Sequence, residues 1–339
     1  MRSIRVPAFA KVNLRLDILG RRPDGYHELR TIFQSLTLHD TLVMTLTENP
    51  GIELRVSGDA SLAASDVRKN LVWRAVTMLS QAVRGFHAAD GGPQSKAQRR
   101  VNDGVRIELL KRIPVGRGLG GGSSDAASAM AGWLRLTGQR VPLPQLLEIG
   151  RALGSDVPFF LFGGRALGVG RGDEIYPQLD LPRHTILVVS PRDISVSTVE
   201  AYARLDRLNR PASTGLTKRA AASKLRSFCA LCWSPQGIAL SNDFERAVFR
   251  WHSRLGRIRR DLLEQGAAGA SLAGSGSAVF AIFRNPAQAR RAARKFPEDR
   301  VFLCSTQSRK AYARALWGSV EGITRWSSTD EPVAANARS

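Results

Sequence analysis

The residues best suited to chemistry begin with a glycine-rich segment at positions 114–127, in which five glycines fall within seven residues. Glycine tolerates positive φ and lacks a Cβ, so the backbone can lie directly against a ligand. Ser123, Ser124 or Asp125 can cap the helix that the following alanine-rich run predicts. Free N–H groups at a helix N-terminus attract anions. The segment therefore predicts a loop that wraps around phosphates.

Two better-known glycine patterns fit this segment poorly. A P-loop requires a lysine after its glycines, and no lysine follows here. A dinucleotide fingerprint can be laid on Gly116, Gly118 and Gly121, but it needs an acidic residue about 20 positions further on. Residues 133–138 read as helix and carry no acid. A flexible linker remains as an alternative, although linkers are usually flanked by polar low-complexity sequence, and this segment follows a strand pattern at 105–109.

Two polar pairs near the N-terminus are further candidates. Lys11 and Asn13 lie on the same face of a predicted strand. If that face is buried, the lysine needs an anionic partner; if it is exposed, both side chains are simply hydrated. A Pro-Asp-Gly turn then presents Tyr26 beside His27. An aromatic ring can stack on a nucleobase and an imidazole can bond to its edge, although the same residues also suit a plain turn.

Two later segments complete the set. Asp156 precedes a Val-Pro pair and by itself suits a turn or a helix cap. Residues 268–280 read as a glycine-rich turn between two strands, which is a hairpin by default.

These segments together resemble the GHMP kinase superfamily. The residues that carry the likeness are Pro-x-Gly-x-Gly-Leu-Gly-Gly-Gly-Ser-Ser-Asp-Ala-Ala from Pro114 and the segments around Lys11, Asp156 and Gly274. The Pro-Asp-Gly-Tyr-His segment ending at His27 resembles the branch of the family that phosphorylates a diphosphocytidyl-methylerythritol substrate. The likeness covers about residues 4–305.

The resemblance implies a role for each site residue. It implies ATP as co-substrate and Mg²⁺ as cofactor, with no protein metal ligand assigned. Lys11 and Asp156 are the implied catalytic residues, with Asp156 as the base. The implied ATP-binding residues are Asn70, Pro114, Val115, Gly116, Arg117, Gly118, Leu119, Gly120, Gly121, Gly122, Ser123 and Ser124. The implied residues for the cytidine diphosphate substrate are Asn13, Tyr26, His27, Tyr202, Gly274 and Ser275.

Four positions in the two glycine-rich segments depart from the family pattern. Arg117 stands where a small residue is usual, and either contacts a phosphate or points to solvent. Ala273 stands where serine is usual, and Ser277-Ala278 replaces a common Pro-Thr.

The elements that must position these residues alternate between strands and helices. Strands are predicted at 14–18, 42–46, 52–56, 105–110, 185–189, in a strand–turn–strand unit at 269–283, and at 300–304. Helices are predicted at 70–83, from the glycine segment to 136, from 144 to 154, and at 286–295. The pattern predicts an α+β protein with two lobes. The resemblance implies a ribosomal-protein-S5-like lobe at 1–180 and a ferredoxin-like lobe at 181–324. Composition, outside the resemblance, predicts an exposed insertion at 85–104 and a frayed tail at 325–339.

Composition limits the kinds of partner that we expect this protein to bind. The 339 residues carry 50 Lys and Arg against 29 Asp and Glu, a net charge of +21, and 43% are hydrophobic. Such a charge fits nucleic acid, a membrane surface or an anionic substrate. The basic clusters are short and lack interleaved aromatic residues, and no apolar run reaches 18 residues. We therefore expect a small anionic substrate, with neither nucleic acid nor membrane as partner.

The three cysteines, Cys229, Cys232 and Cys304, form at most half a zinc site or a redox pair, and buried free thiols of a cytoplasmic protein are the simpler interpretation. We expect a monomer or a weak homodimer. The alternative functions are a kinase for another small alcohol such as homoserine or mevalonate, a basic nucleic-acid-binding protein, and a dinucleotide-dependent oxidoreductase.

Overall fold

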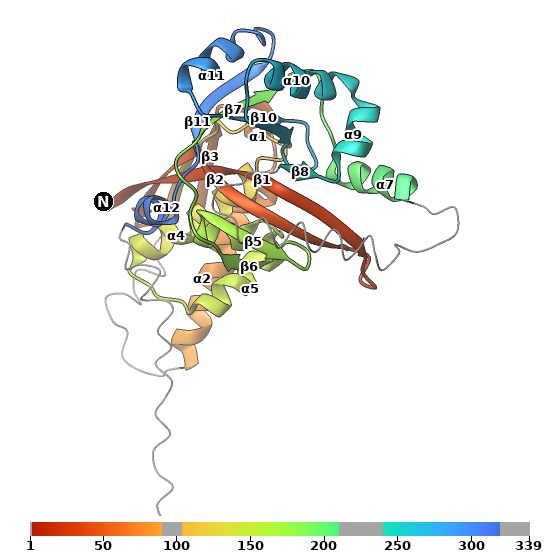
Figure 1. The fold of residues 1–339 in the computed structure, drawn as a ribbon. Helices are drawn as coiled ribbons and strands as arrows, with labels where there is room; N and C mark the ends of the chain where they lie inside the picture. Colours follow the sequence, from red (N-terminus) through yellow and green to blue (C-terminus); the bar gives the residue numbers. More distant parts are fainter. Residues whose placement is uncertain (1, 90–103, 210–239, 319–339) are drawn as a thin grey trace, which may run out of the picture.

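The computed structural model describes residues 2–89, 104–209 and 240–318 (Figure 1). Two sheets organise these residues. Seven strands form the larger sheet, in the order β3-β4-β2-β1-β8, with β5 paired to β2 and β6 paired to β5. Four strands form the smaller, antiparallel sheet, in the order β11-β7-β10-β9. The fold is thus α+β with two lobes, as the sequence predicts.

A long hairpin of β1 (Ser3–Arg21) and β2 (His27–Thr47) crosses the middle of the molecule (Figure 1). The other strands of the larger sheet are β3 (Ile52–Ser57), β4 (Gly104–Leu110), β5 (Arg165–Val169), β6 (Glu174–Pro177) and β8 (Ser241–Asn242). The hairpin carries residues from both ends of the predicted site.

Helices pack on the larger sheet around one apolar core. They are α2 (Leu71–Ala89), α4 (Gly121–Thr137), α5 (Leu143–Leu153), α6 (Val157–Phe162) and α12 (Arg309–Trp317). A short helix α1 (Ala60–Ala63) and a 3-10 turn η1 (Val67–Lys69) precede α2. Helix α4 presses closely on β2, because a Cβ at Gly132 would collide with the sulfur of Met44. This packing fixes α4 against the sheet, and the glycine segment ends in the first turn of this helix.

The smaller sheet consists of β7 (Thr185–Ser190), β9 (Gly269–Leu272), β10 (Val279–Phe283) and β11 (Arg300–Ser305). Around it lie α7 (Thr198–Asn209), α9 (Glu245–Trp251), α10 (Ser253–Glu264) and α11 (Pro286–Ala293). A second apolar cluster joins the lobes, because Val12 and Leu36 of the long hairpin pack in the same buried cluster as Val188 and Phe280. The lobes therefore share a core rather than a polar hinge.

The structure corrects several predictions. Helix α4 begins directly after Gly120, which has a φ of 71° and makes no side-chain cap, so the predicted caps Ser123, Ser124 and Asp125 lie inside the helix. Helix α2 continues to Ala89, past the predicted start of the insertion at 85. The sequence predicts neither the β5–β6 hairpin nor α12. The pair Cys229 and Cys232 and the tail at 325–339 lie outside the described residues.

A buried charge cluster stands behind the glycine segment. The ammonium group of Lys111 forms ion pairs with Asp40 of β2 and, at 2.6 Å, with Asp125 of α4. Asp40 also accepts hydrogen bonds from the backbone N–H groups of Arg112 and Ile113. Burial raises the pKa of Asp125 to about 8, although the charge of Lys111 opposes the shift. The charges of Asp125 and Asp40 outweigh the burial of Lys111 and raise its pKa.

Substitution of Asp125 by Asn should change how stability depends on pH. The folded state holds the Asp125 proton more tightly than the unfolded chain, so this group favours folding at low pH and loses that contribution as pH rises towards about 8. We expect the free energy of unfolding of Asp125→Asn, relative to that of wild type, to increase as the pH rises from 6 to 9. Below pH 8 the increase should be at most about 1.4 kcal/mol per pH unit. Urea denaturation at several pH values measures this difference.

Asp59→Asn is the matched control. The pKa of Asp59 is lowered, first by a hydrogen bond from Ser61, so it titrates below this pH range and its substitution should leave the slope unchanged. Parallel pH profiles for Asp125→Asn and wild type would contradict the raised pKa.

Candidate active site

A cavity of about 710 Å³ lies where the two lobes meet. Both strands of the long hairpin, the glycine segment, the start of α6 and helix α7 contribute to its wall. The predicted residues that line it are Lys11, Asn13, Tyr26, His27, Gly118, Gly120, Ser123, Asp156, Tyr202, Gly274 and Ser275. The fold thus brings together residues that are far apart in the sequence.

Lys11 and Asp156 form the polar centre of this cavity. The Lys11 Nζ lies 3.2 Å from Asp156 Oδ2 and donates a 2.8 Å hydrogen bond to Asn13 Oδ1. Asn13 in turn donates to the hydroxyl of Thr31 at 2.7 Å. The Lys11 side chain is 5% exposed, whereas that of Asp156 is 32% exposed. The lysine is therefore fixed from two sides, and the carboxylate is accessible from the cavity.

Local backbone structure explains this geometry. The β1–β2 register shifts between Phe9 and Lys11, and such irregularities redirect side chains and release backbone groups. The Lys11 N–H bonds to the carbonyl oxygen of Leu119 in the glycine segment, at 2.9 Å. Asp156 stands at the N-cap position of α6 but makes no side-chain cap bond. Its carboxylate is left to Lys11 and the cavity.

The glycine segment meets the second glycine-rich turn at van der Waals distance. Gly118 has a φ of +78°, and a Cβ there would collide with the carbonyl oxygen of Ala273. A Cβ on Gly274 would lie 3.1 Å from the oxygen of Gly118 and 3.5 Å from Lys11 Nζ. The two lobes therefore touch through bare backbone beside Lys11.

Asn242 holds that second turn in place. Its Nδ2 donates to the carbonyl oxygens of Leu272 and Gly274, at 2.9 and 2.7 Å. Ser275 Oγ pairs with the hydroxyl of Thr198 at 2.9 Å. The sequence assigns no role to Asn242, although its Asn-Asp-Phe-Glu segment is a recognisable signal.

Arg117 neither enters the cavity nor points freely to solvent. Its Nη1 donates to Ser277 Oγ at 2.7 Å, and that hydroxyl donates to the carbonyl of Ile194 at 2.7 Å. Burial, followed by the charge of Arg300, lowers the pKa of the guanidinium. Arg117 and Ser277, which both depart from the family pattern, thus bond to each other across the lobes.

Aromatic and acidic side chains gather at the other end of the cavity. The His27 ring stacks on Tyr202, with centroids 4.3 Å apart and planes 17° apart, and its Nε2 lies 2.8 Å from Asp206 Oδ1. Tyr202 also meets Phe244 edge to face at 4.8 Å. Burial, then the charges of Asp156 and Asp206, raises the pKa of Tyr202 to about 12, so its phenol stays neutral. Sequence reasoning missed Asp206, whose spacing of one helical turn after Tyr202 is the available signal.

Some predicted ATP-binding residues lie away from this cavity. Asn70 Oδ1 accepts the N–H of Val72 at 2.9 Å and so caps α2. Ser124 is fully buried, and its hydroxyl has no partner among the described residues. Pro114 and Val115 line a separate cavity of about 280 Å³ together with Arg117. Their roles towards ATP stay predictions.

Known proteins share this arrangement along most of the chain. Residues 70–164 match the GHMP kinases N terminal domain, and residues 225–300 match the GHMP kinases C terminal domain. A protein of Solibacter usitatus (strain Ellin6076) is 42% identical over 93% of this chain and 92% of its own length. The chain belongs to the GHMP kinase family. As a member, it is a small-molecule kinase, which confirms the predicted class of enzyme and fold.

The named relatives of this GHMP kinase point to one branch. The Solibacter protein is a 4-diphosphocytidyl-2-C-methyl-D-erythritol kinase, as is a protein of Geobacter sulfurreducens that is 40% identical over 86% of this chain and 94% of its own length. A crystal structure of 4-(cytidine 5'-diphospho)-2C-methyl-D-erythritol kinase is 33% identical, with a TM-score of 0.67 over 90% of this chain and all of the other. A homoserine kinase from Cytophaga hutchinsonii, at 19% identity and a TM-score of 0.64 over 91% of this chain and 95% of its own, shows the shared fold alone.

The described residues contain neither a membrane-spanning helix nor a cluster of metal-binding side chains. Within residues 2–89, 104–209 and 240–318, no helix has the length and apolar character needed to span a bilayer. The same residues contain no group of three or more His, Cys, Asp or Glu side chains placed to hold a metal ion.

Alanine at Gly118 should disrupt the contact between the lobes. The new Cβ would collide with the backbone of Ala273 at a position that already has positive φ. Gly116→Ala is the matched control, because Gly116 has a φ of +68° but nothing within 4 Å of a Cβ. We expect Gly118→Ala to lower the free energy of unfolding by about 1–3 kcal/mol more than Gly116→Ala, and to weaken ATP binding. Urea denaturation and nucleotide titration measure both effects, and equal losses in the two variants would refute the contact.

Proposed function

We propose that this kinase transfers the γ-phosphoryl group of ATP to the 2-hydroxyl of 4-diphosphocytidyl-2-C-methyl-D-erythritol, in the non-mevalonate route to isoprenoid precursors. The observation that carries the proposal is the Lys11–Asp156 pair, at 3.2 Å, in a cavity walled by the glycine segment. The names of the relatives supply the substrate.

Asp156 acts as the general base in this proposal. A tertiary hydroxyl is a weak nucleophile, so a positioned carboxylate that takes its proton speeds the transfer. Lys11 Nζ lies 3.2 Å from that carboxylate and holds it in the cavity by an ion pair. Its ammonium group also offsets the charge that develops on the reacting oxygens. Asn13 fixes Lys11 Nζ from the side opposite Asp156.

The glycine segment holds the ATP phosphates in this proposal. The backbone at Gly118 and Gly120 lines the cavity, and α4 begins directly after Gly120, where the first N–H groups of a helix have no intrahelical partner. Phosphoryl transfer depends mainly on positioning and on charge neutralisation. The N-terminus of this 17-residue helix supplies both without a charged side chain.

The residues present also fit Mg²⁺. This ion prefers one or two protein oxygens together with nucleotide phosphates and water, and the Ser123 hydroxyl and the accessible Asp156 carboxylate both line the cavity. Bound Mg²⁺ supplies neutralisation of the phosphate charge. Ser123 is the side chain that would hold it, since the Asp156 carboxylate is paired with Lys11 and serves as the base.

The aromatic end receives the cytosine in this proposal. Tyr26 offers an open ring, with 54% of the residue exposed, and His27 offers a ring nitrogen. The face of Tyr202 is covered by His27, so Tyr202 supports the histidine as well as bounding the pocket. Asp206 accepts from His27 Nε2 and thereby orients the imidazole.

We also propose a lobe boundary near residue 180, a cytoplasmic location, and a monomer or weak homodimer. The half-buried thiol of Cys304, which is free among the described residues and whose pKa burial raises to about 12, supports the location because it suits a reducing compartment. Helix α12 packs with the core of the first lobe although it follows the second along the chain.

Asp156→Asn should slow the chemical step. The amide keeps the shape of the carboxylate but cannot take a proton, so we expect kcat to fall by about 10²–10⁴, with the KM of the cytidyl substrate changed less than threefold. Single-turnover assays with ATP measure the step directly. Asp180→Asn, outside the cavity, serves as the control. Near-normal turnover in Asp156→Asn would rule out the base.

A substrate panel separates this proposal from a kinase for another small alcohol. ADP release is measured with the cytidyl substrate, its uridyl analogue, homoserine and mevalonate. We expect turnover with the cytidyl substrate, and in His27→Ala a loss of its advantage over the uridyl analogue of about tenfold, the value of one neutral hydrogen bond. Turnover of homoserine or mevalonate alone would favour the other kinase.

A further inference from the structure

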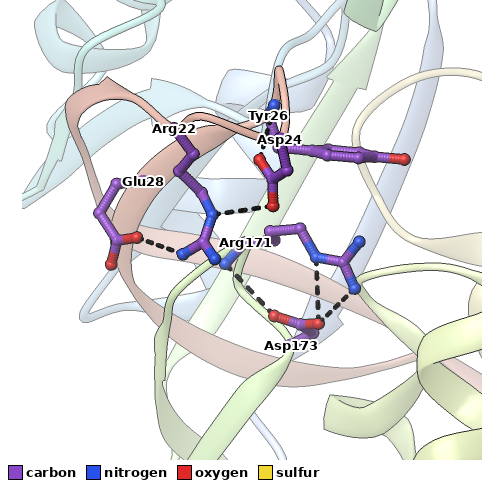
Figure 2. A network of polar contacts seen from close by, with 6 residues as sticks. All are labelled: Arg22, Asp24, Tyr26, Glu28, Arg171 and Asp173. Carbon is purple, nitrogen blue, oxygen red and sulfur yellow. Dashed lines mark hydrogen bonds and ion pairs between the residues drawn. The ribbon is translucent and has the colours of Figure 1, made fainter.

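The turn between β5 and β6 places an arginine beside the aromatic end of the cavity. The Arg171 Cζ lies 4.9 Å from the centre of the Tyr26 ring, which is cation–π distance (Figure 2). Both residues line the same cavity as Lys11. The family resemblance assigns no role to Arg171, and the sequence predicts no hairpin at this position.

Arg171 is held by its own turn. Its Nη2 and Nε donate to Asp173 Oδ2 at 2.8 and 3.3 Å, and its backbone N–H donates to the other carboxylate oxygen at 3.2 Å. Asp173 is 6% exposed. The turn is attached to the long hairpin, because Leu29 N–H donates to the carbonyl of Gly170 at 2.8 Å. The guanidinium is therefore fixed in place by groups that do not include Tyr26.

The backbone of Tyr26 is fixed by a separate set of bonds. Asp24 Oδ1 accepts the N–H of Tyr26 at 3.0 Å. Arg22 links Asp24 to Glu28 across the turn, at 3.2 and 2.6 Å (Figure 2). These bonds hold the main chain but leave the ring itself exposed, and Figure 2 shows the ring extending away from Asp24 above the guanidinium of Arg171.

We propose that Arg171 is a positioning residue that holds the Tyr26 ring by one face, so that the other face is ready to stack on the aromatic base of the substrate. The inference rests on the proposed function, since it needs a substrate with a base. Without Arg171, the exposed ring would lose rotamer freedom only when the substrate binds, and that ordering reduces affinity. Arg171 orders the Tyr26 ring before the substrate binds, so binding no longer carries this loss of rotamer freedom. Arg171 does not touch the phosphoryl-transfer centre.

A double-mutant cycle tests the inference. The variants are Arg171→Met, Tyr26→Leu and the double substitution, each assayed with saturating ATP and varied cytidyl substrate. We expect Arg171→Met to raise KM about threefold to tenfold, with kcat within twofold of wild type. We expect Tyr26→Leu to raise KM further, and the double variant to match Tyr26→Leu. Arg171→Lys keeps a cation over the ring without the two-pronged bond to Asp173, and should recover part of the loss.

Two controls separate positioning from general stability. Arg106→Met removes an exposed arginine that pairs with Glu53 at 2.8 Å outside the cavity, and should leave KM unchanged. A truncated substrate without its cytidine should react equally, though slowly, with Arg171→Met and wild type. If Arg171→Met fails to fold, as judged by its thermal transition, Arg171→Lys and Arg171→Gln carry the same cycle.

The outcomes distinguish the two proposals. No turnover of the cytidyl substrate by wild-type protein overturns the proposed function. Normal wild-type turnover with an unchanged KM in Arg171→Met overturns the positioning role. Additive losses in the double variant also overturn it, because Arg171 would then act on the substrate independently of Tyr26.

Discussion

The arrangement of this kinase depends on one close contact between two stretches of backbone. Gly118 of the glycine segment lies against Ala273 and Gly274 of the opposite lobe, with no room for a side chain between them. Only glycine allows so close a contact at this position, because any Cβ at Gly118 would overlap the facing carbonyl of Ala273. The contact closes the cavity on one side and places Lys11 at the junction. Asn242 supports it from behind by binding two carbonyl groups of the turn. Both lobes must therefore be folded before the site exists.

Two buried lysines stand on opposite sides of the glycine segment, and each has its own carboxylate partners. Lys11 faces the cavity and pairs with Asp156, while Lys111 lies behind the segment between Asp40 and Asp125. An unpaired charge at either position would cost several kcal/mol, so these partners allow positive charge to be kept beside the glycine segment. The two pairs differ in accessibility: the Asp156 side chain is 32% exposed and that of Asp125 is 4% exposed. Only the first is accessible from the cavity, whereas the second joins β2, the residue that follows β4, and α4.

Much of the fold and the chemical centre follows from the sequence, and the failures have physical causes. The spacing of Lys11 and Asn13 predicts one strand face, and the 2.8 Å bond between them agrees. Cap preference alone favours Ser123, Ser124 or Asp125 before the start of α4, but the helix begins at Gly121, inside the closely packed glycine segment. The side chain of Arg117 could not be placed, because its partner Ser277 is 160 residues away. The role of Asp206 could not be predicted for the same reason, because Asp206 contacts His27 only in the folded chain.

The long hairpin sets the distance between the two ends of the site. Lys11 and Asn13 lie in the middle of β1, and Tyr26 and His27 lie at the turn that joins it to β2. A change in register by one residue would turn each side chain to the opposite face of the sheet, so both ends depend on the same ladder. The three register shifts of this ladder follow Phe9, Asn13 and Ile18, between the glycine contact and the turn. The net charge of +21 attracts anions of any length, and it is largely screened beyond about 8 Å at physiological ionic strength. The distance between the two ends of the cavity is therefore set by the hairpin and not by the overall charge.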